Sequence, residues 1–436
     1  MTTEPDLLPP LDNAAIERLI LAAGGRDETL REAVGALGVR QVCAVLADEV
    51  AFRAEVPVMD LMDSPVQLQF DITHDGLRVP HVIEASHGVP VHLFAGTAEH
   101  AAMLVEYELT DLVHDLFGPA RERRSGRRRT VPRFEEAAAR RPDLRILTVT
   151  RSAHQAVTAV LSGIDKPADL GALAVRYYSD KWGGLHWFTP HYERHFADLR
   201  DKPVRVLEIG VGGYTTTTFG GGSLRMWRRF FTRGLVYGLD IFDKTVADQP
   251  RVKTLIGSQD DPGYLNAMAA EYGPFDVIID DGSHVNAHVL TSFRTLLPHL
   301  NPGGRYVIED LWTAYSTGYG GIEGTTAGAG TSIGLLKELV DAIHYEDHSG
   351  PEAGAEPGFA AANVVGLHVY HNLAVIEKDR NAEGGVPAWC RGPHPGQFAT
   401  PPAGAQPSAT PSSATQSSAT QPGSAEPAPG SDRAAG

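Results

Sequence analysis

The chain has 436 residues, and its 38 lysines and arginines against 54 aspartates and glutamates leave a formal net charge of −16. This acidic balance argues against a broad nucleic-acid-binding surface, which needs basic charge to displace phosphate counterions. The chain has only two cysteines, Cys43 and Cys390, and no apolar run close to the roughly 18 residues that cross a bilayer. We therefore expect a cytoplasmic protein with no disulfide framework, no membrane partner and no nucleic-acid partner.

Helical and strand patterns are mixed in the first part of the chain, over residues 13–163. An amphipathic helical pattern ends at two glycines, Gly24 and Gly25, which is typical of a helix stop. Two runs in which apolar and polar residues alternate, as in half-buried strands, lie on either side of a turn signal. The predicted helices cover residues 14–23 and 103–117, and the predicted strands cover residues 66–72 and 81–85. These patterns predict an α+β accessory domain that follows a flexible N-terminus of residues 1–12.

The pattern changes at about residue 175, where short apolar runs rich in branched residues alternate with helical stretches. Such runs indicate strands buried on both faces of a parallel sheet, and right-handed crossovers between them give a doubly wound α/β fold. The last two runs are separated only by His371-Asn372, so they form an antiparallel hairpin. The predicted strands cover residues 204–210, 235–241, 252–257, 275–281, 305–310, 364–370 and 373–378, and the predicted helices cover residues 224–231, 262–272, 286–297 and 333–344.

A mostly parallel, Rossmann-like sheet of seven strands that ends in one antiparallel hairpin is the arrangement of the class I S-adenosylmethionine (SAM) methyltransferases. We therefore predict a SAM-dependent methyltransferase domain over residues 175–392. Residues 393–436 are almost entirely small and polar residues with proline, and they cannot bury enough apolar surface to offset the entropy of ordering. We predict that they form a disordered tail.

A basic run occupies residues 121–129, after the predicted helix 103–117 and within the predicted accessory domain. Such a cluster can bind phosphate or nucleic acid. Because the run has no interleaved aromatic residues and the chain is acidic, we favour a solvated loop.

Acidic residues gather at the predicted carboxyl ends of the strands, where ligands bind in such a sheet. The first strand ends in Glu208-Ile-Gly210-Val-Gly212, a loop that lacks the third glycine of the dinucleotide fingerprint. Its acid suits a ligand with an ammonium group, such as the methionine part of SAM, and Asp240 at the next strand end can accept both ribose hydroxyls. The alternative is a glycine turn that only joins strand to helix. The acids at both strand ends favour a SAM site.

Asp281, Glu309 and Asp310 follow two adjacent strands and form a group of candidate metal ligands. Three carboxylates provide hard oxygen ligands for Mg²⁺ and leave positions for water or substrate. His284, on the turn after Asp281, can face the same ion and remove the proton of a hydroxyl whose pKa the cation lowers. The alternative is that the acids cap helices and that His284 is an ordinary turn residue. Because all four residues meet at one edge, we favour a metal site with a base.

Other histidines lie in aromatic surroundings, before the first strand and at the late hairpin. For these we expect structural or substrate-contact roles rather than metal ligation. They are His186, His191, His195, His368 and His371.

Several longer stretches resemble the macrolide sugar O-methyltransferases. They include the glycine loop, the acidic strand ends, the aromatic entry to the second domain and part of the accessory domain, so the resemblance covers residues 15–390. The tail and the strongly basic run 121–129 depart from the family pattern. The stretches are residues 103–110, 185–192, 207–214, 220–227, 279–288, 306–315 and 368–374.

The resemblance implies a Mg²⁺ site formed by Asp281, Glu309 and Asp310, with His284 as the general base. It also implies that Asp240 lies at the ribose of SAM, that Gln259 and Asp260 lie near the adenine, and that Asp280 approaches the sulfonium. Members of the family are tetramers whose accessory domain helps to complete active sites, so we expect a homo-oligomer. The residues expected around SAM are Glu208, Gly210, Gly212, Ser223, Asp240, Gln259, Asp260 and Asp280.

The sequence thus predicts a Mg²⁺-dependent O-methyltransferase that moves the methyl group of SAM to a hydroxyl of a 6-deoxyhexose on a macrolide antibiotic intermediate. The expected acceptor is the 2-hydroxyl. Three alternatives stay open: an O-methyltransferase of another glycosylated natural product, a nicotinamide-dependent oxidoreductase, and a non-catalytic ligand-binding protein. The first would methylate a different glycoside, the second would bind NAD in place of SAM, and the third would bind SAM without transferring its methyl group.

Overall fold

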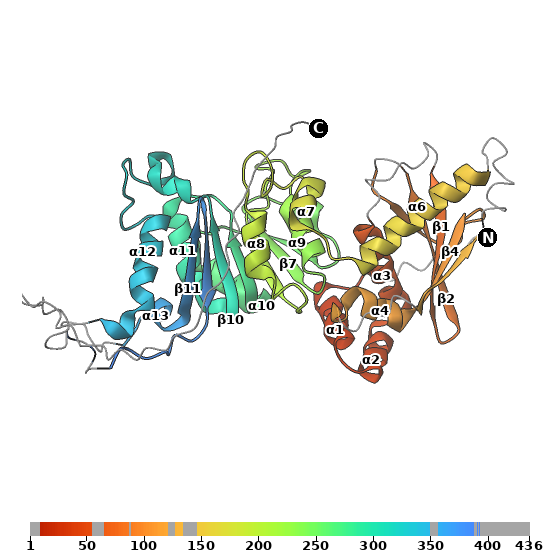
Figure 1. Ribbon diagram of the computed structural model, residues 1–436, viewed down its shortest axis with the longest axis horizontal. Helices are drawn as coiled ribbons and strands as arrows, with labels where there is room; N and C mark the ends of the chain where they lie inside the picture. The colour runs from red at the N-terminus through yellow and green to blue at the C-terminus, as the bar shows by residue number, and fades with distance from the viewer. Residues whose placement is uncertain are drawn as a thin grey trace, which may run out of the picture. The chain divides into compact units, whose positions relative to one another are not determined.

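The computed structural model describes residues 9–54, 65–86, 89–120, 127–133, 146–348, 356–387, 390 and 392 (Figure 1). The predictions made for residues 1–8, for most of the basic run and for the tail lie outside the described residues. The described residues up to Gly385 pack as one compact unit. None of the described helices is both long and apolar enough to cross a membrane.

Helices and a five-stranded sheet make up the N-terminal part. The apolar side chains of α1 are buried on one face, and Asp12 caps the helix by accepting a hydrogen bond from the Ala15 amide at 2.8 Å. The sheet has the order β3-β2-β1-β4-β5, in which β1 and β4 pair in parallel and the other neighbours pair antiparallel. This arrangement confirms the α+β class. The elements are α1 (Asn13–Ala23), α2 (Asp27–Leu37), α3 (Val39–Arg53), β1 (Val66–His74), β2 (Leu77–Ala85), β3 (His92–Ala95), β4 (Met103–Glu108), α4 (Leu109–Phe117), β5 (Arg129–Pro132) and α6 (Ile146–Asp165).

The single helix predicted over residues 103–117 is wrong. Its first six residues form strand β4, which pairs with β1, and the helix α4 begins only at Leu109. The boundary is set by Glu108, whose carboxylate accepts hydrogen bonds from the amides of Thr110 and Asp111 at 2.8 and 3.2 Å and so caps α4. A short apolar run does not separate a strand from a helix by periodicity alone. The carboxylate cap was the missed signal.

The second sheet has seven strands in the order β11-β12-β10-β9-β6-β7-β8. The neighbours from β10 to β8 pair in parallel, and β12 pairs antiparallel with both β10 and β11. The predicted SAM methyltransferase sheet, mostly parallel and ending in one hairpin, is confirmed. Its strands are β6 (Arg205–Ile209), β7 (Leu235–Asp240), β8 (Val252–Ile256), β9 (Phe275–Asp280), β10 (Leu300–Glu309), β11 (Val364–Tyr370) and β12 (Leu373–Lys378).

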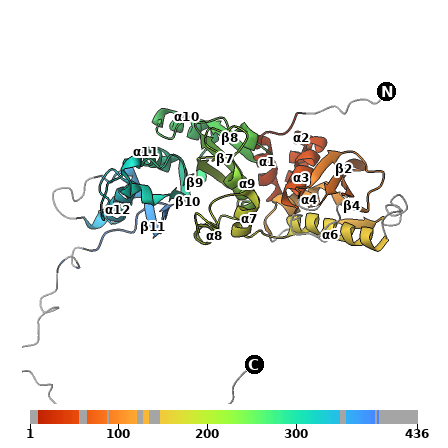
Figure 2. The same cartoon turned by 90° about the horizontal axis from the view of Figure 1, so that it is seen from above.

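Helices cover both faces of this sheet (Figure 2). Successive strand residues point to opposite faces, so Ile278 of β9 packs in the core that α10 and α11 share, while Ile279 packs with α7, α8 and α9. With both faces covered, the carboxyl ends of the parallel strands form the edge where ligands bind. The helices are α7 (Leu170–Tyr177), α8 (Thr189–Phe196), α9 (Gly222–Phe230), α10 (Pro262–Tyr272), α11 (Asn286–Leu296), α12 (Ser332–Ile343) and α13 (Phe359–Asn363).

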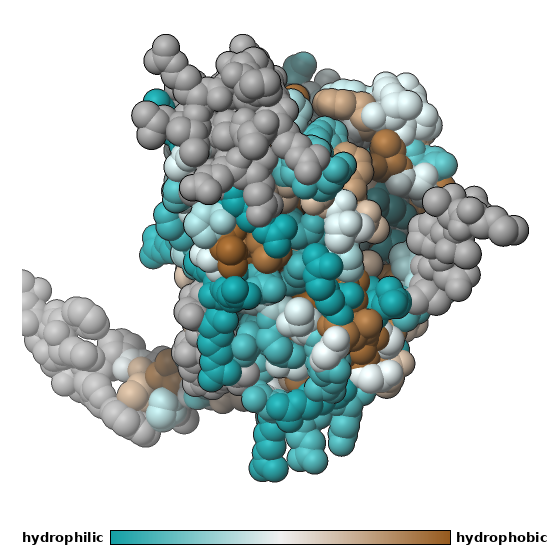
Figure 3. Space-filling view, turned by 90° about the vertical axis from the view of Figure 1, so that its right-hand side faces the viewer, coloured by the Kyte–Doolittle hydropathy of each residue, from teal (hydrophilic) through white to brown (hydrophobic). Residues whose placement is uncertain are grey.

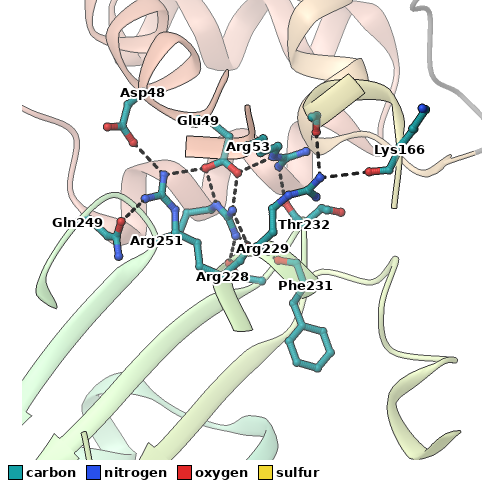
Figure 4. A network of polar contacts seen from close by, with 12 residues as sticks. Asp48, Glu49, Arg53, Lys166, Arg228, Arg229, Phe231, Thr232, Gln249 and Arg251 are labelled. Atoms are coloured by element: carbon teal, nitrogen blue, oxygen red, sulfur yellow. Dashed lines mark hydrogen bonds and ion pairs between the residues drawn. The ribbon is translucent and has the colours of Figure 1, made fainter. Parts of the chain in front are cut away.

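A buried cluster of three arginines around Glu49 joins α3 to α9 and to the start of β8 (Figure 4). The Glu49 side chain is fully buried, and its carboxylate accepts hydrogen bonds from Arg53 Nε at 2.6 Å, Arg251 Nη2 at 2.5 Å and Arg228 Nη2 at 2.9 Å. Burial alone would raise the pKa of Glu49, but the three guanidinium groups hold it well below its usual range. The carboxylate is therefore ionised and is the central anion of this contact between the N-terminal part and the second sheet.

The face of the N-terminal part drawn in Figure 3 is mostly hydrophilic, and its hydrophobic side chains lie in separate small patches. Several large exposed apolar side chains lie in the second part of the chain, between α7 and α8 and in the segments that follow β6 and β10. They include Tyr178, Leu185, Trp187, Tyr214, Phe219, Trp312 and Tyr315. An apolar ligand would find its contacts there.

Candidate active site

The glycine loop after β6 packs directly against the turn after β9. A Cβ atom on Gly210, whose φ is +94°, would lie 2.1 Å from the Asp281 carbonyl oxygen. Gly212 also has a positive φ, of +75°, but nothing lies within 4 Å of its Cβ position. The loop therefore needs glycine at position 210 to approach β9, and it presents an open side at position 212 that suits a ligand.

A left-handed backbone costs an L-residue about 1–2 kcal/mol. Replacing Gly210 with Ala is expected to lower the free energy of unfolding by more than this, because the Asp281 carbonyl must also move. Gly303→Ala is a matched control: its φ is +78° but its Cβ would meet nothing within 4 Å. Urea unfolding of both variants measures the difference. Equal losses would contradict the close approach.

Two acids of the predicted SAM site form hydrogen bonds within the protein, next to the glycine loop. Asp240 accepts hydrogen bonds from the amides of Val211 at 3.1 Å and Phe242 at 2.9 Å, which joins the ends of β6 and β7. Glu208 is fully buried, so its pKa is raised, and it accepts a hydrogen bond from Ser223 Oγ at 2.7 Å. Ser223 thus positions Glu208 through a direct contact.

Gln259 and Asp280, two further residues of the predicted SAM site, are joined by a hydrogen bond. The Gln259 amide donates to Asp280 at 3.1 Å and accepts from the Ser283 amide at 2.6 Å, so it ties the end of β8 to the turn after β9. Burial raises the pKa of Asp280 to about 6, and Ser292 of α11 donates to its other oxygen. Asp260 lies outside this pair, with its carboxylate 3.4 Å from His288 Nε2.

Lys181, for which the sequence predicts no role, lies among three acids. Its Nζ is 2.7 Å from Glu309, 2.8 Å from Asp281 and 3.2 Å from Glu208. Burial alone would lower the pKa of Lys181, but these three carboxylates hold it well above its usual range. We call Lys181, Glu208, Asp281, Glu309 and Asp310 the acid cluster.

Tyr192 of α8, which had no predicted role, also donates a hydrogen bond to Glu309. Burial and the neighbouring Asp281 raise the pKa of Glu309 well above its usual range despite the contact with Lys181. Even with a proton on Glu309, the three other carboxylates against one ammonium leave the acid cluster with a surplus of negative charge.

Asp310 and His284 meet at the open side of the acid cluster. His284 Nε2 lies 3.4 Å from Asp310 Oδ2, and Asp310 Oδ1 accepts a hydrogen bond from the Asn372 amide of the late hairpin at 2.8 Å. His186 Nε2 is 3.6 Å from the same Asp310 oxygen. Both His284 and Asp310 have left-handed backbones, with φ of +57° and +55°. Such strain costs about 1–3 kcal/mol per residue and is typical of functional sites.

The residues present fit a divalent cation. Asp281, His284 and Asp310 offer ligand atoms that all lie within 4.8 Å of one another. Glu309, a predicted ligand, lies outside this group because its carboxylate is bound to Lys181 and Tyr192. The surplus negative charge of the acid cluster is the feature that calls for a further cation.

Known proteins resemble this chain over most of its length. The family model for the N-terminal region of MycE methyltransferases matches residues 16–128. Demethylmacrocin O-methyltransferase of Streptomyces fradiae is 50% identical over 377 residues, which are 86% of this chain and 93% of the relative. Mycinamicin VI 2''-O-methyltransferase of Micromonospora griseorubida is 46% identical over 87% of this chain and 94% of its own length. The structure of MycE methyltransferase with Mg, SAH and mycinamycin VI matches at a TM-score of 0.80 and 45% identity, over 87% of this chain and 96% of that chain.

Proposed function

This chain belongs to the macrolide sugar O-methyltransferases, and we propose that it transfers the methyl group of SAM to a hydroxyl of a 6-deoxyhexose on a macrolide, with the 2-hydroxyl as the acceptor. It is a SAM-dependent O-methyltransferase with Mg²⁺ as its metal cofactor. The observation that carries the proposed site is the meeting of Asp281, His284 and Asp310 within 4.8 Å. Exposed apolar side chains such as Trp187, Phe219 and Trp312 suit a macrolide ring.

SAM supplies an activated methyl group, and Mg²⁺ supplies positive charge that favours an ionised sugar hydroxyl. Asp281, Glu309 and Asp310 would hold the metal, with Glu309 exchanging its contact with Lys181 for one with the ion. Without the metal, Lys181 neutralises part of the charge of Asp281 and Glu309. His284 Nε2 takes the proton of the hydroxyl while the oxygen forms its bond to the methyl carbon and the bond from that carbon to sulfur breaks, which leaves a neutral thioether. Asp310, 3.4 Å from His284 Nε2, stabilises the imidazolium that forms.

Around the cofactor, we assign binding to the residues at the carboxyl ends of β6, β7, β8 and β9. Asp240 suits the ribose diol. Glu208, Gln259 and Asp280 already have buried protein partners, so they would act on SAM chiefly by fixing the loop geometry. The assigned residues are Glu208, Gly210, Gly212, Ser223, Asp240, Gln259, Asp260 and Asp280.

The direct test incubates the purified enzyme with methyl-labelled SAM, Mg²⁺ and a panel of desmethyl glycosides that includes macrolides and one non-macrolide. We expect label on a deoxyhexose oxygen of a macrolide, and we expect chelation of Mg²⁺ to abolish transfer. Preference for the non-macrolide would identify another glycosylated product as the substrate. Thermal stabilisation by NAD but not by SAM would favour an oxidoreductase, and SAM binding without transfer to any glycoside would favour a non-catalytic role.

Replacing His284 with Ala is expected to lower turnover by roughly 10²–10⁴-fold, the usual contribution of a general base. The affinity for SAM should change little, because His284 is not among the residues assigned to SAM. Calorimetric titration with SAM beside the methyl-transfer assay measures both. His344→Ala, on the end of α12 and outside the site, is the control. Full activity of the His284 variant would refute the assigned role.

We also propose a homotetramer in the cytoplasm, in which the N-terminal part of the chain, residues 13–163, contributes to neighbouring active sites. The family resemblance supports the tetramer. Two free cysteines, Cys43 and Cys390, fit a reducing compartment. Light scattering of the purified protein measures the oligomeric state.

A further inference from the structure

A second group of potential metal ligands lies outside the acid cluster. Among the residues that the structure describes, His195 of α8, His368 of β11 and Glu377 of β12 offer ligand atoms within 4.8 Å of one another. Glu377 Oε1 is 3.3 Å from His368 Nε2 and 3.8 Å from His195 Nδ1. The two imidazole rings have their centroids 4.4 Å apart. From the sequence we expected only structural or substrate-contact roles for these histidines.

The hydrogen bonding of His195 leaves one ring nitrogen for an ion. His195 Nε2 is 2.8 Å from the hydroxyl oxygen of Tyr370, so this nitrogen is engaged. Nδ1 faces Glu377 at 3.8 Å, which is too long for a direct hydrogen bond. A ring nitrogen that faces a carboxylate at this distance, without a direct hydrogen bond to it, leaves room for a cation between them.

The distances suit a small four-coordinate ion. In a tetrahedral zinc site each ligand lies about 2.0–2.1 Å from the metal, so two ligand atoms stand roughly 3.4 Å apart. The separations of 3.3 and 3.8 Å from Glu377 Oε1 lie on either side of that value. Two histidines and a glutamate are also a donor set that zinc uses, with water in the fourth position.

We propose that His195 Nδ1, His368 Nε2 and Glu377 bind one zinc ion, or another late transition-metal ion, at a site separate from the magnesium site. The donors distinguish the two sites, because Mg²⁺ prefers oxygen ligands and imidazole nitrogen suits Zn²⁺. Arg305 Nε, 3.3 Å from Glu377 Oε1, already balances part of the charge of Glu377. The second site therefore has less negative charge than the acid cluster and depends more on its nitrogen ligands.

An ion at this group would tie α8 to the hairpin of β11 and β12. Both elements also support the acid cluster: Tyr192 of α8 donates to Glu309, and Asn372 at the hairpin turn donates to Asp310. The proposed ion would thus hold together two of the elements that position the magnesium ligands.

The test uses Co²⁺, whose four-coordinate complexes absorb visible light strongly, as the probe on the full-length chain. The protein is stripped with a chelator and saturated with Mg²⁺, so that the acid cluster is filled before Co²⁺ is titrated. We expect one Co²⁺ per chain with a four-coordinate spectrum, and competition by Zn²⁺ that removes the spectrum. His368→Ala should weaken binding by far more than tenfold, and its side chain is 38% exposed, so its removal leaves the core intact.

Two further variants separate a metal site from a general loss of structure. Tyr370→Phe removes the hydroxyl next to His195 Nε2 but no ligand, and it should weaken Co²⁺ binding by roughly 10–100-fold. His371→Ala, in the same hairpin, and His284→Ala, in the acid cluster, should leave the spectrum unchanged. Absence of a four-coordinate spectrum, its persistence in His368→Ala, or its loss in His284→Ala would each overturn the proposal. Circular dichroism of every variant checks that the fold is intact.

Discussion

Replacing Lys181 with Met is expected to lower the free energy of unfolding of the Mg²⁺-free protein by about 3–5 kcal/mol, the cost of leaving buried charge without its partner. The Lys181 ammonium lies within 3.2 Å of the carboxylates of Glu208, Asp281 and Glu309. Without it, these acids repel one another in a buried setting. Urea unfolding in the presence of a chelator measures the loss.

Saturating Mg²⁺ should restore part of the lost stability, because a divalent ion returns positive charge to the same carboxylates. Mg²⁺ should therefore stabilise Lys181→Met more than it stabilises the unaltered protein. Lys202→Met is the matched control, since Lys202 and its partner Asp198 are both more than half exposed and 3.6 Å apart, and an exposed pair contributes less than about 1 kcal/mol. Equal stabilisation of both proteins by Mg²⁺ would show that the ion does not bind beside these acids.

The meeting of Asp281, His284 and Asp310 was predictable because strand ends can be read from a sequence. The runs of branched apolar residues mark β9 and β10, and parallel strands that pair side by side end at one edge. Residues that follow two such ends must lie close together. The glycine loop at position 210 was predictable as well, because it follows a strand end. The close approach of the Asp281 carbonyl to Gly210 was not predictable.

The partners of the acids were not predictable, because they come from distant parts of the chain. Lys181 is 100 residues from Asp281 and 128 residues from Glu309. It lies in a loop before α8 with no periodic pattern, so nothing local indicates that its ammonium is buried. Glu208 and Glu309 were expected to face SAM and Mg²⁺. In the structure their carboxylates contact Lys181, Ser223 and Tyr192.

The zinc proposal shows the same limit for histidines. His195 and His368 are separated by a long stretch of chain, and their spacing matches no metal-binding motif. Only the packing of α8 against the hairpin brings them together with Glu377. Pattern reading alone favoured an ordinary structural role for each of them.

Replacing Glu49 with Gln is expected to lower the free energy of unfolding by about 3–5 kcal/mol as well, because it removes the buried anion that three buried guanidinium groups share. Arg53, Arg228 and Arg251 all donate to the Glu49 carboxylate, and the side chain of each is at most 1% exposed. A neutral amide has one acceptor oxygen, and its NH₂ group would face a guanidinium. Thermal and urea unfolding measure the loss, and limited proteolysis should show earlier cleavage between the N-terminal part and the second sheet.

Asp48, the acid next to Glu49 in the chain, provides the control variant. The pH dependence of the free energy of unfolding provides the decisive test. Asp48 also contacts Arg228, at 2.8 Å, but its side chain is 43% exposed, so Asp48→Asn should cost less than about 1 kcal/mol. Because the Glu49 pKa lies well below 4.5 in the folded protein, the unfolded chain takes up the proton first as the pH falls. The stability that Glu49 contributes is therefore complete above pH 4.5 and is lost below it. The gap between the unaltered protein and Glu49→Gln should stay constant near neutral pH and narrow in acid; a gap that widens in acid would mean that Glu49 is not ionised in its arginine cluster.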